Sequence, residues 1–338
     1  MPLIPRVGRQ KPRTRALLFG IAAFLWLGVL LHLFPVVWMV SASLKPTPEI
    51  FEAPFRLIPK EPTTASYELL FKTVQSTALN SSFDVFRYPL WVYLKNSLWI
   101  ATLTTFLQLP ITALAAYAVS KLHSRRAAKI LFFFFIGTLM IPGQVAVVPR
   151  FLLLSHFPWP TRAVPELLGY ALPSLSFVGT YWGIVLPAAF SAFNFLLFKG
   201  FFDTLPTELI EAARIDGASE GRTLTQIMLP LARPVIAVTG YFTFTGAWND
   251  FLGPWIMLMS EQGRWPLSVA LYKLQAALTS WQPTSGSADP NAAALIASGV
   301  GYNALMALAV IESIPMFIAF LLFREQLMKG IQISGLKG

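Results

Sequence analysis

Six long apolar runs, separated by polar and proline-containing segments, dominate the chain. A helix needs about 20 consecutive apolar residues to cross the hydrocarbon core of a bilayer. The runs cover residues 16–40, 98–119, 130–148, 178–198, 234–258 and 305–323. The pattern predicts an all-α integral membrane protein with six transmembrane helices. The spanning domain would occupy residues 16–324, between a basic tail of residues 1–15 and a second tail of residues 325–338.

The first run resembles a signal peptide but is too long to be one. Basic residues precede it, and Ser41-Ala42-Ser43 follows it as a cleavage site would. However, its apolar stretch far exceeds the ~7–15 residues of a signal-peptide core. We therefore expect a retained helix.

The composition fits a membrane protein better than a soluble one. Of the 338 residues, 55% are hydrophobic and 12% are charged, whereas soluble domains carry about 25% charged residues. The chain has no cysteine, so disulfides and thiolate metal ligands are excluded. The histidines at positions 32, 123 and 156 are too scattered to predict a metal site.

The basic residues predict the orientation in the membrane. Sixteen of the 26 Lys and Arg residues lie in the two tails and in the loops after the second and fourth runs. Because Lys and Arg accumulate in cytoplasmic loops, both termini are expected in the cytoplasm. Loops 45–95, 150–176 and 259–300 would then lie outside. The net charge of +10 is explained by this topology and by lipid contact, so no nucleic-acid partner is expected.

Residues 204–233, between the fourth and fifth runs, read as two short helices around a sharp turn. Thr204 is expected to cap the first helix, and Pro206 suits its opening turn. Gly217 can supply the left-handed residue that ends this helix, and Ser219 can cap the second. Such an ordered cytoplasmic loop needs a partner surface. The alternative is an amphipathic hairpin that lies on the bilayer.

The same loop resembles a known family. Glu211-Ala212-Ala213, then Gly217, Ile227, Leu229 and Pro230, are similar to the EAA motif of ABC importer permeases. The string Glu-Ala-Ala-Arg-Ile-Asp-Gly-Ala-Ser resembles the carbohydrate-uptake branch, in particular the maltose G-type permeases. Shorter matches occur elsewhere, including Asn96-Ser97 at the second run and Trp248-Asn-Asp-Phe-Leu252 in the fifth.

This resemblance implies a fold, a function and a set of partners. The fold would be that of type I ABC importer permeases, in the inner membrane of a bacterial cell, with a coupling helix that docks on a cytoplasmic ATPase. The residues implied in this contact are Glu211, Ala212, Ala213, Asp216, Gly217 and Leu224. The expected partners are a second, homologous permease, two ATPase subunits and an extracytoplasmic solute-binding protein. The chain would bind no cofactor, because ATP and Mg belong to the ATPase subunits.

Polar residues inside the apolar runs are candidates for the solute path. A charge at mid-membrane costs about 2.5–3.5 kcal/mol on insertion scales, so it usually faces a cavity or a partner. The candidates are Asn194, Trp248, Asn249 and Asp250, whose aromatic and polar groups suit a di- or oligosaccharide. The alternative is that they hydrogen-bond between helices and hold the bundle together.

Two other classes of protein fit the sequence less well. A membrane enzyme would have to use Asp250 and Glu312, which lie in different runs without an accompanying nucleophile or metal-ligand cluster. A secondary transporter should show inverted repeats and broken helices, and neither is evident. No G-x-x-x-x-G-K-[ST] loop occurs, so the chain is not expected to hydrolyse ATP. Among importers, one for glycerol-phosphate or polyamine-like solutes is the alternative.

Overall fold

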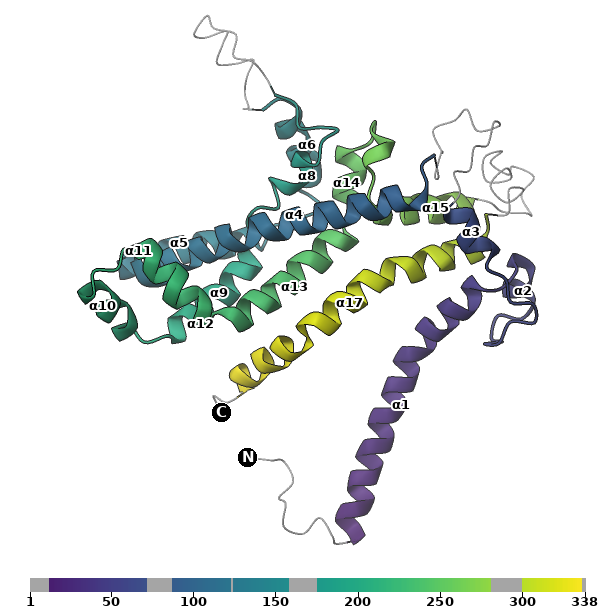
Figure 1. Ribbon diagram of the computed structural model, residues 1–338, viewed down its shortest axis with the longest axis horizontal. Coiled ribbons are helices and arrows are strands. Elements are labelled where there is room, and N and C mark those ends of the chain that lie inside the picture. Colours follow the sequence, from purple (N-terminus) through teal and green to yellow (C-terminus); the bar gives the residue numbers. More distant parts are fainter. Residues whose placement is uncertain (1–11, 72–86, 123, 158–174, 281–299, 336–338) are drawn as a thin grey trace, which may run out of the picture. The chain divides into compact units, whose positions relative to one another are not determined.

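The computed structural model describes residues 12–71, 87–122, 124–157, 175–280 and 300–335 (Figure 1). These residues are predominantly helical, and the one β-bridge among them joins Phe157 to Leu175. They divide into two compact units. The first comprises residues 1–70 and 280–311, and the second comprises residues 71–279 and 312–338. The two units are described separately below.

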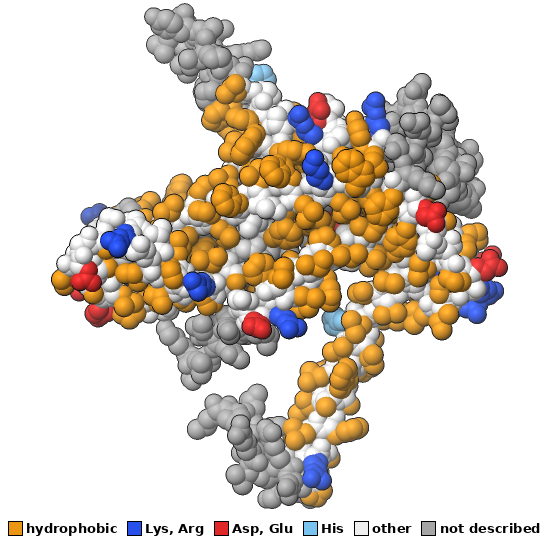
Figure 2. All heavy atoms as spheres, in the orientation of Figure 1, with side chains coloured by type: hydrophobic (Ala, Val, Ile, Leu, Met, Phe, Trp, Pro, Cys, Tyr) orange, Lys and Arg blue, Asp and Glu red, His pale blue; other side chains and the backbone are white. Residues whose placement is uncertain are grey.

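The first unit contains a long apolar helix, α1 (Pro12–Ser43). Large apolar side chains such as Phe24, Trp26 and Leu30 are exposed along its length, and Figure 2 shows hydrophobic side chains covering this helix. A helix that is apolar on all sides is typical of a membrane span. This agrees with the predicted first span.

Beyond α1, the first unit folds through side-chain hydrogen bonds and ring contacts. The Ser43 and Tyr67 hydroxyls lie 2.7 Å apart, which ties the end of α1 to α3 (Ala65–Phe71). Helix α2 (Thr47–Glu52) packs on the start of α17 (Tyr302–Gly335) through a Phe51–Tyr302 edge contact with ring centroids 5.4 Å apart. Part of the predicted outer loop 45–95 is thus ordered, while residues 72–86 lie outside the described residues.

The second unit is built around α4 (Leu90–Tyr117), against which α9 (Ala192–Thr204) and α13 (Arg233–Asn249) pack. Small residues of α4 and aromatic residues of α9 form a buried cluster, together with apolar residues of the loop that follows α9. The cluster includes Ala113, Ala116, Tyr117, Phe195, Phe198, Phe202, Ile210, Leu224 and Met228. Alanines at the helix contact let the aromatic rings approach closely. One core therefore holds both the bundle and the loop.

Among the described residues, three helices are long and apolar enough to cross a membrane: Thr14–Ser43, Leu90–Leu122 and Tyr302–Leu327. A fourth is obtained if the bent pair Glu220–Leu231 and Arg233–Asn249, with 81° between its arms, counts as one span. Two of these candidate spans cover the second and sixth predicted runs, and both helices are longer than expected. Helix α17 continues through most of the predicted C-terminal tail, to Gly335.

The third, fourth and fifth predicted spans are not confirmed, because none of these runs forms one continuous helix. The third contains only α5 (Arg125–Thr138), which ends before Pro142, and α6 (Val147–Ser155) follows after a turn. The fourth is divided into α8 (Trp182–Val185) and α9, because the chain turns near Pro187 before α9 begins. Proline cannot donate a backbone hydrogen bond in a helix interior, and it interrupts the helix.

The fifth run breaks at Asp250, between α13 and α14 (Leu252–Met257). Ser268 at the start of α15 (Leu267–Ser280) donates a hydrogen bond of 2.8 Å to the Asp250 carbonyl oxygen. The break thus coincides with the polar residues that stand out in this apolar run. The break directs α14 away from the axis of α13 (Figure 1).

Asn96 and Ser97 bring two chain segments together at the start of α4. The Asn96 amide donates to the carbonyl oxygens of Gly263 and Trp265, both at 2.9 Å. Ser97 accepts a hydrogen bond of 2.7 Å from the backbone N–H of Leu267. These backbone groups have no helical partner, so the two side chains satisfy them and stabilise the fold here.

Candidate functional site: the loop hairpin and the central cavity

The loop after α9 folds into the expected hairpin. Its first helix is α10 (Glu208–Ile215) and its second is α11 (Glu220–Thr223). Gly217 has a φ of +78°. Its N–H donates to the Arg214 carbonyl oxygen at 3.0 Å, and the Ala218 N–H donates to that of Ala213 at 2.9 Å. These two bonds are the Schellman motif, which requires a left-handed residue at this position. The predicted turn is confirmed.

The caps of the hairpin differ in part from expectation. The Ser219 hydroxyl accepts from the Arg222 N–H at 3.4 Å, so the cap of the second helix is confirmed. Thr204 does not cap α10, because its hydroxyl donates to the Phe201 carbonyl oxygen at 2.7 Å and it lies at the end of α9. Leu205 is extended, as expected of a residue before proline. Helix α9 therefore ends at Thr204, and the extended Leu205 separates it from α10.

One polar contact joins the hairpin to α4, and a second one lies within the hairpin. The Tyr117 hydroxyl donates to Glu220 at 2.9 Å, and the guanidinium of Arg214 donates to the same carboxylate at 2.7 and 3.0 Å. The hydrogen bond from Arg214, and then that from Tyr117, hold the pKa of Glu220 below its usual value. Further along, Lys121 donates to the Leu205 carbonyl oxygen at 2.8 Å. The hairpin is thus held to α4 by Tyr117, and the segment just before the hairpin is held by Lys121, which follows α4.

The hairpin has a buried face and an exposed face. Ala213 and Leu224 are buried, so these two predicted contact residues face the core of this unit. Glu211, Ala212, Asp216 and Gly217 are exposed. The exposed face also includes Ile215, of which 86% is exposed. Sequence reasoning missed this residue, although its spacing of three from Ala212 places it on the same helical face.

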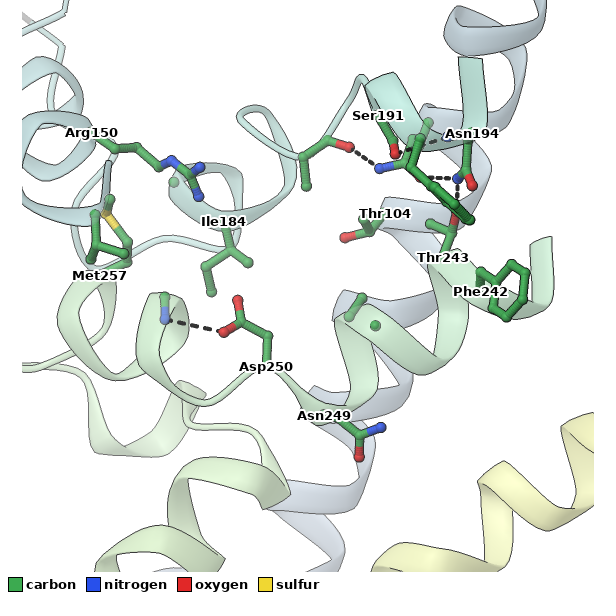
Figure 3. A pocket seen from close by; sticks show the side chains of 18 residues that line it. Thr104, Arg150, Ile184, Ser191, Asn194, Phe242, Thr243, Asn249, Asp250 and Met257 are labelled. Atoms are coloured by element: carbon green, nitrogen blue, oxygen red, sulfur yellow. Dashed lines mark hydrogen bonds between the residues drawn. The ribbon is translucent and has the colours of Figure 1, made fainter. Parts of the chain in front are cut away.

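The second unit also contains a cavity of about 510 Å³, lined by α4, α6, α8, α9, α13, α14 and the segments between them (Figure 3). Polar side chains from several of these elements reach it. They include Thr104, Gln108, Arg150, Asn194, Asn249 and Asp250. Ligand sites in proteins commonly have volumes of about 300–1,000 Å³ with a few polar groups in a mainly apolar wall. The cavity therefore has the size and lining of a site for a polar solute.

Three side chains form a closed hydrogen-bond network in one wall of the cavity. The Asn194 amide donates to Gln108 and to Thr243, both at 2.8 Å, and Gln108 donates to the Ala188 carbonyl oxygen at 2.6 Å. Because the three residues belong to α9, α4 and α13, the network joins the three central helices. The amide nitrogen of Asn194 therefore bonds between helices, which favours the structural alternative over contact with a solute.

Asp250 shapes the corner between α13 and α14. Its carboxylate accepts a hydrogen bond of 3.3 Å from the Gly253 N–H. A Cβ at Gly253 would lie only 2.7 Å from a carboxylate oxygen of Asp250, so glycine is required for this approach. Asp250 and Asn249 both line the cavity, which keeps them as candidates for the solute path.

Trp248, the fourth candidate, is not among the residues that line the cavity. Its side chain is buried, and its indole N–H donates to the Glu312 carbonyl oxygen at 3.1 Å. Its ring stacks on Phe244 with the centroids 5.9 Å apart. These contacts make Trp248 a packing residue between α13 and α17. Glu312 is also not a lining residue, so the cavity does not combine the two carboxylates that the enzyme hypothesis requires.

No group of three or more His, Asp or Glu side chains in the described part of the chain is arranged to hold a metal ion.

The chain as a whole is similar to known proteins. Residues 108–331 match the family model described as "Binding-protein-dependent transport system inner membrane component". Protein LplC of Bacillus subtilis is 28% identical over 322 residues, 95% of each chain. The trehalose/maltose transport system permease protein MalG of Thermococcus litoralis is 30% identical, over 90% of this chain and 92% of that protein.

One solved structure has a similar fold over the whole chain. It is the crystal structure of a bacterial ABC transporter involved in the import of the acidic polysaccharide alginate. Its matching chain is 21% identical, with a TM-score of 0.66, over 97% of this chain and 100% of that one.

Proposed function

Because the chain belongs to the family of binding-protein-dependent transport system inner membrane components, we propose that it forms half of the translocation pathway of an ATP-driven importer for a di- or oligosaccharide. The family is one of transport permeases, not of catalytic subunits. The names of the relatives support a saccharide, since they include trehalose/maltose transport and alginate import.

The proposed assembly contains three kinds of partner. A second, homologous permease forms the other half of the pathway, an external solute-binding protein delivers the solute, and two ATPase subunits bind ATP and Mg. The family's dependence on a binding protein supports the second of these partners. Both termini and the hairpin would lie on the cytoplasmic side of the inner membrane, as the distribution of Lys and Arg predicts.

The observation that carries the proposal is that α4 and α9 hold the hairpin at one end and line the cavity at the other. On α4, Tyr117 bonds to the hairpin and Thr104 lines the cavity. They are 13 positions apart, about 20 Å along a helix. On α9, Phe202 belongs to the same buried cluster as the hairpin residue Ile210, and Asn194 lines the cavity. A displacement of the hairpin would therefore move the cavity wall.

The burial of the hairpin argues against the alternative of a hairpin that lies on the bilayer. Its apolar residues Ile210, Leu224 and Met228 pack into the core with α4 and α9. A surface-bound amphipathic hairpin would instead present its apolar face to lipid. What the hairpin leaves exposed is a short mixed face around Glu211, Ala212 and Ile215, which suits a protein partner.

The test is saccharide uptake by the transporter assembled with its ATPase subunits, second permease and binding protein in liposomes. Uptake should require ATP inside and the binding protein outside. Ala212→Tyr places a large side chain on the exposed face, so it should abolish stimulation of the ATPase by the binding protein. Arg56→Tyr, also at an exposed position but in a predicted outer loop, is the control. Equal stimulation in both variants would refute the proposed role of the hairpin.

A further inference from the structure

One wall of the cavity contains a buried hydroxyl that bonds to none of the described residues. Thr104 on α4 is 3% exposed and lines the cavity, and its hydroxyl makes no hydrogen bond within the described residues. The neighbouring Thr105 bonds to the Ala101 carbonyl oxygen at 2.7 Å, as threonines in helices commonly do. Buried polar groups are nearly always satisfied, so an exception calls for a ligand or water.

Arg150 on α6 brings a positive charge to the same cavity. Its guanidinium forms no hydrogen bond or ion pair with any described residue. Figure 3 shows the guanidinium and the Thr104 hydroxyl pointing toward the same space between α6 and α4. An arginine in a membrane protein usually has a partner or faces a polar ligand. Two unused donors thus face one cavity.

The cavity has one other charged lining residue, Asp250, and its carboxylate is engaged in the corner between α13 and α14. It accepts from the Gly253 N–H and bonds to the backbone of Leu252. Asp250 interacts electrostatically with Arg150, but the two form no ion pair among the described residues. The backbone N–H groups offset the negative charge of Asp250, which leaves the donors of Arg150 available to a solute.

We propose that this cavity binds the anionic group of an acidic solute, with the Arg150 guanidinium as its charge partner and the Thr104 hydroxyl as a second donor. This rests on the proposed function in that the cavity belongs to the translocation pathway. A carboxylate or a phosphate can take two parallel N–H bonds from one guanidinium. A neutral sugar would not give the guanidinium an ion-pair partner. The solute class is therefore a saccharide with carboxylate groups, or a sugar or polyol phosphate.

The cavity's charge can be measured without knowing the natural solute, because the chain has no cysteine of its own. Ile184, which lines the cavity between Arg150 and Asp250 (Figure 3), is replaced by cysteine in the full chain, purified in the assembled transporter. The reaction rates with anionic sulfonatoethyl and cationic trimethylammonioethyl methanethiosulfonate are then compared. The anionic reagent should react faster. Arg150→Gln should lower the anionic-to-cationic rate ratio on the order of tenfold.

Two further variants separate charge from shape. Arg150→Lys should keep most of the ratio, and Arg222→Gln, at an exposed position on the hairpin, should leave it unchanged. The inference is overturned if the ratio is the same in the parent and in Arg150→Gln.

A solute that binds in the cavity should protect the Ile184→Cys thiol from the methanethiosulfonate reagents. Which solutes protect it identifies the source of the anionic group. Trigalacturonate represents a carboxylate, glycerol 3-phosphate a phosphate, and maltotriose a neutral saccharide. Protection by either acidic probe that is lost in Arg150→Gln supports the inference and names the group. Protection by none, or as strongly by maltotriose, overturns it. Charge selectivity without ATP-driven uptake would instead contradict the proposed function and leave this inference standing.

Discussion

Replacing Gly217 by alanine should weaken the hairpin turn through backbone strain alone. Gly217 has a φ of +78°, and a Cβ added there would meet no atom within 4 Å. The substitution therefore causes no clash. An L-residue in the left-handed region costs roughly 1–2 kcal/mol relative to the right-handed one. The backbone hydrogen bonds from Gly217 to Arg214 and from Ala218 to Ala213 depend on that conformation.

A cost of 1–2 kcal/mol changes the population of the open turn by a factor of about 5–30. The assay is hydrogen exchange of the Gly217 and Ala218 amides in the assembled transporter, whose rates should rise by this factor. Gly221→Ala is the matched control, because a Cβ there also meets nothing within 4 Å and its φ is not in the left-handed region. In a helix, alanine is favoured over glycine by about 1 kcal/mol. Equal exchange in both variants would refute the reasoning.

Three other variants test how the hairpin and the bundle are held. Tyr117→Phe removes the hydroxyl that bonds to Glu220, and should lower the free energy of unfolding of purified protein by about 0.5–1.5 kcal/mol; an unchanged midpoint of thermal unfolding would contradict this. In a double-mutant cycle, Asn194→Ala and Thr243→Ala should couple by about 0.6 kcal/mol, the average for hydrogen bonds between membrane helices, and additive effects would show that the network does not join α9 to α13. Glu220 has a lowered pKa because of Arg214 and Tyr117, so its contribution to hairpin stability is complete above pH 4.5, the pKa of an ordinary glutamate, and is lost as the pH falls through the lowered value. This loss of stability should appear as faster hydrogen exchange in α11 at low pH, and Glu220→Gln should abolish the effect. If the effect persists in Glu220→Gln, it belongs to another group.

The hairpin was predictable from the sequence because its determinants are local. Gly217 and Ser219 act on backbone groups within a few residues, so the turn and the second cap follow from residue type and spacing. The family was predictable for the same reason, since the motif lies in one uninterrupted loop. Thr204 was misjudged because its hydroxyl could bond either forward to a new helix or back to Phe201. The extended Leu205 before Pro206 decided this in favour of α9.

The breaks in the third to fifth apolar runs were not predictable from hydropathy. Apolar content measures the environment of a segment, whereas continuity of a helix depends on backbone hydrogen bonds. Pro142 and Pro187 interrupt these without changing the apolar character. The cavity was only partly predictable, because Asn194, Asn249 and Asp250 stood out as polar residues in apolar runs. Arg150 did not, since it lies in a segment that was expected to be an outer loop, and only the fold brings α6 beside α14.

The central claim, that the exposed face of α10 is the docking site of an ATPase, is tested most directly by cross-linking from a single cysteine. Ile215→Cys is suitable because this side chain is 86% exposed and the chain has no other cysteine. In inner-membrane vesicles that contain the assembled transporter, Ile215→Cys should cross-link to the ATPase subunit, while Arg56→Cys should not. Failure of Ile215→Cys to capture that subunit, or its labelling by an impermeant reagent from the periplasmic side, would contradict the account.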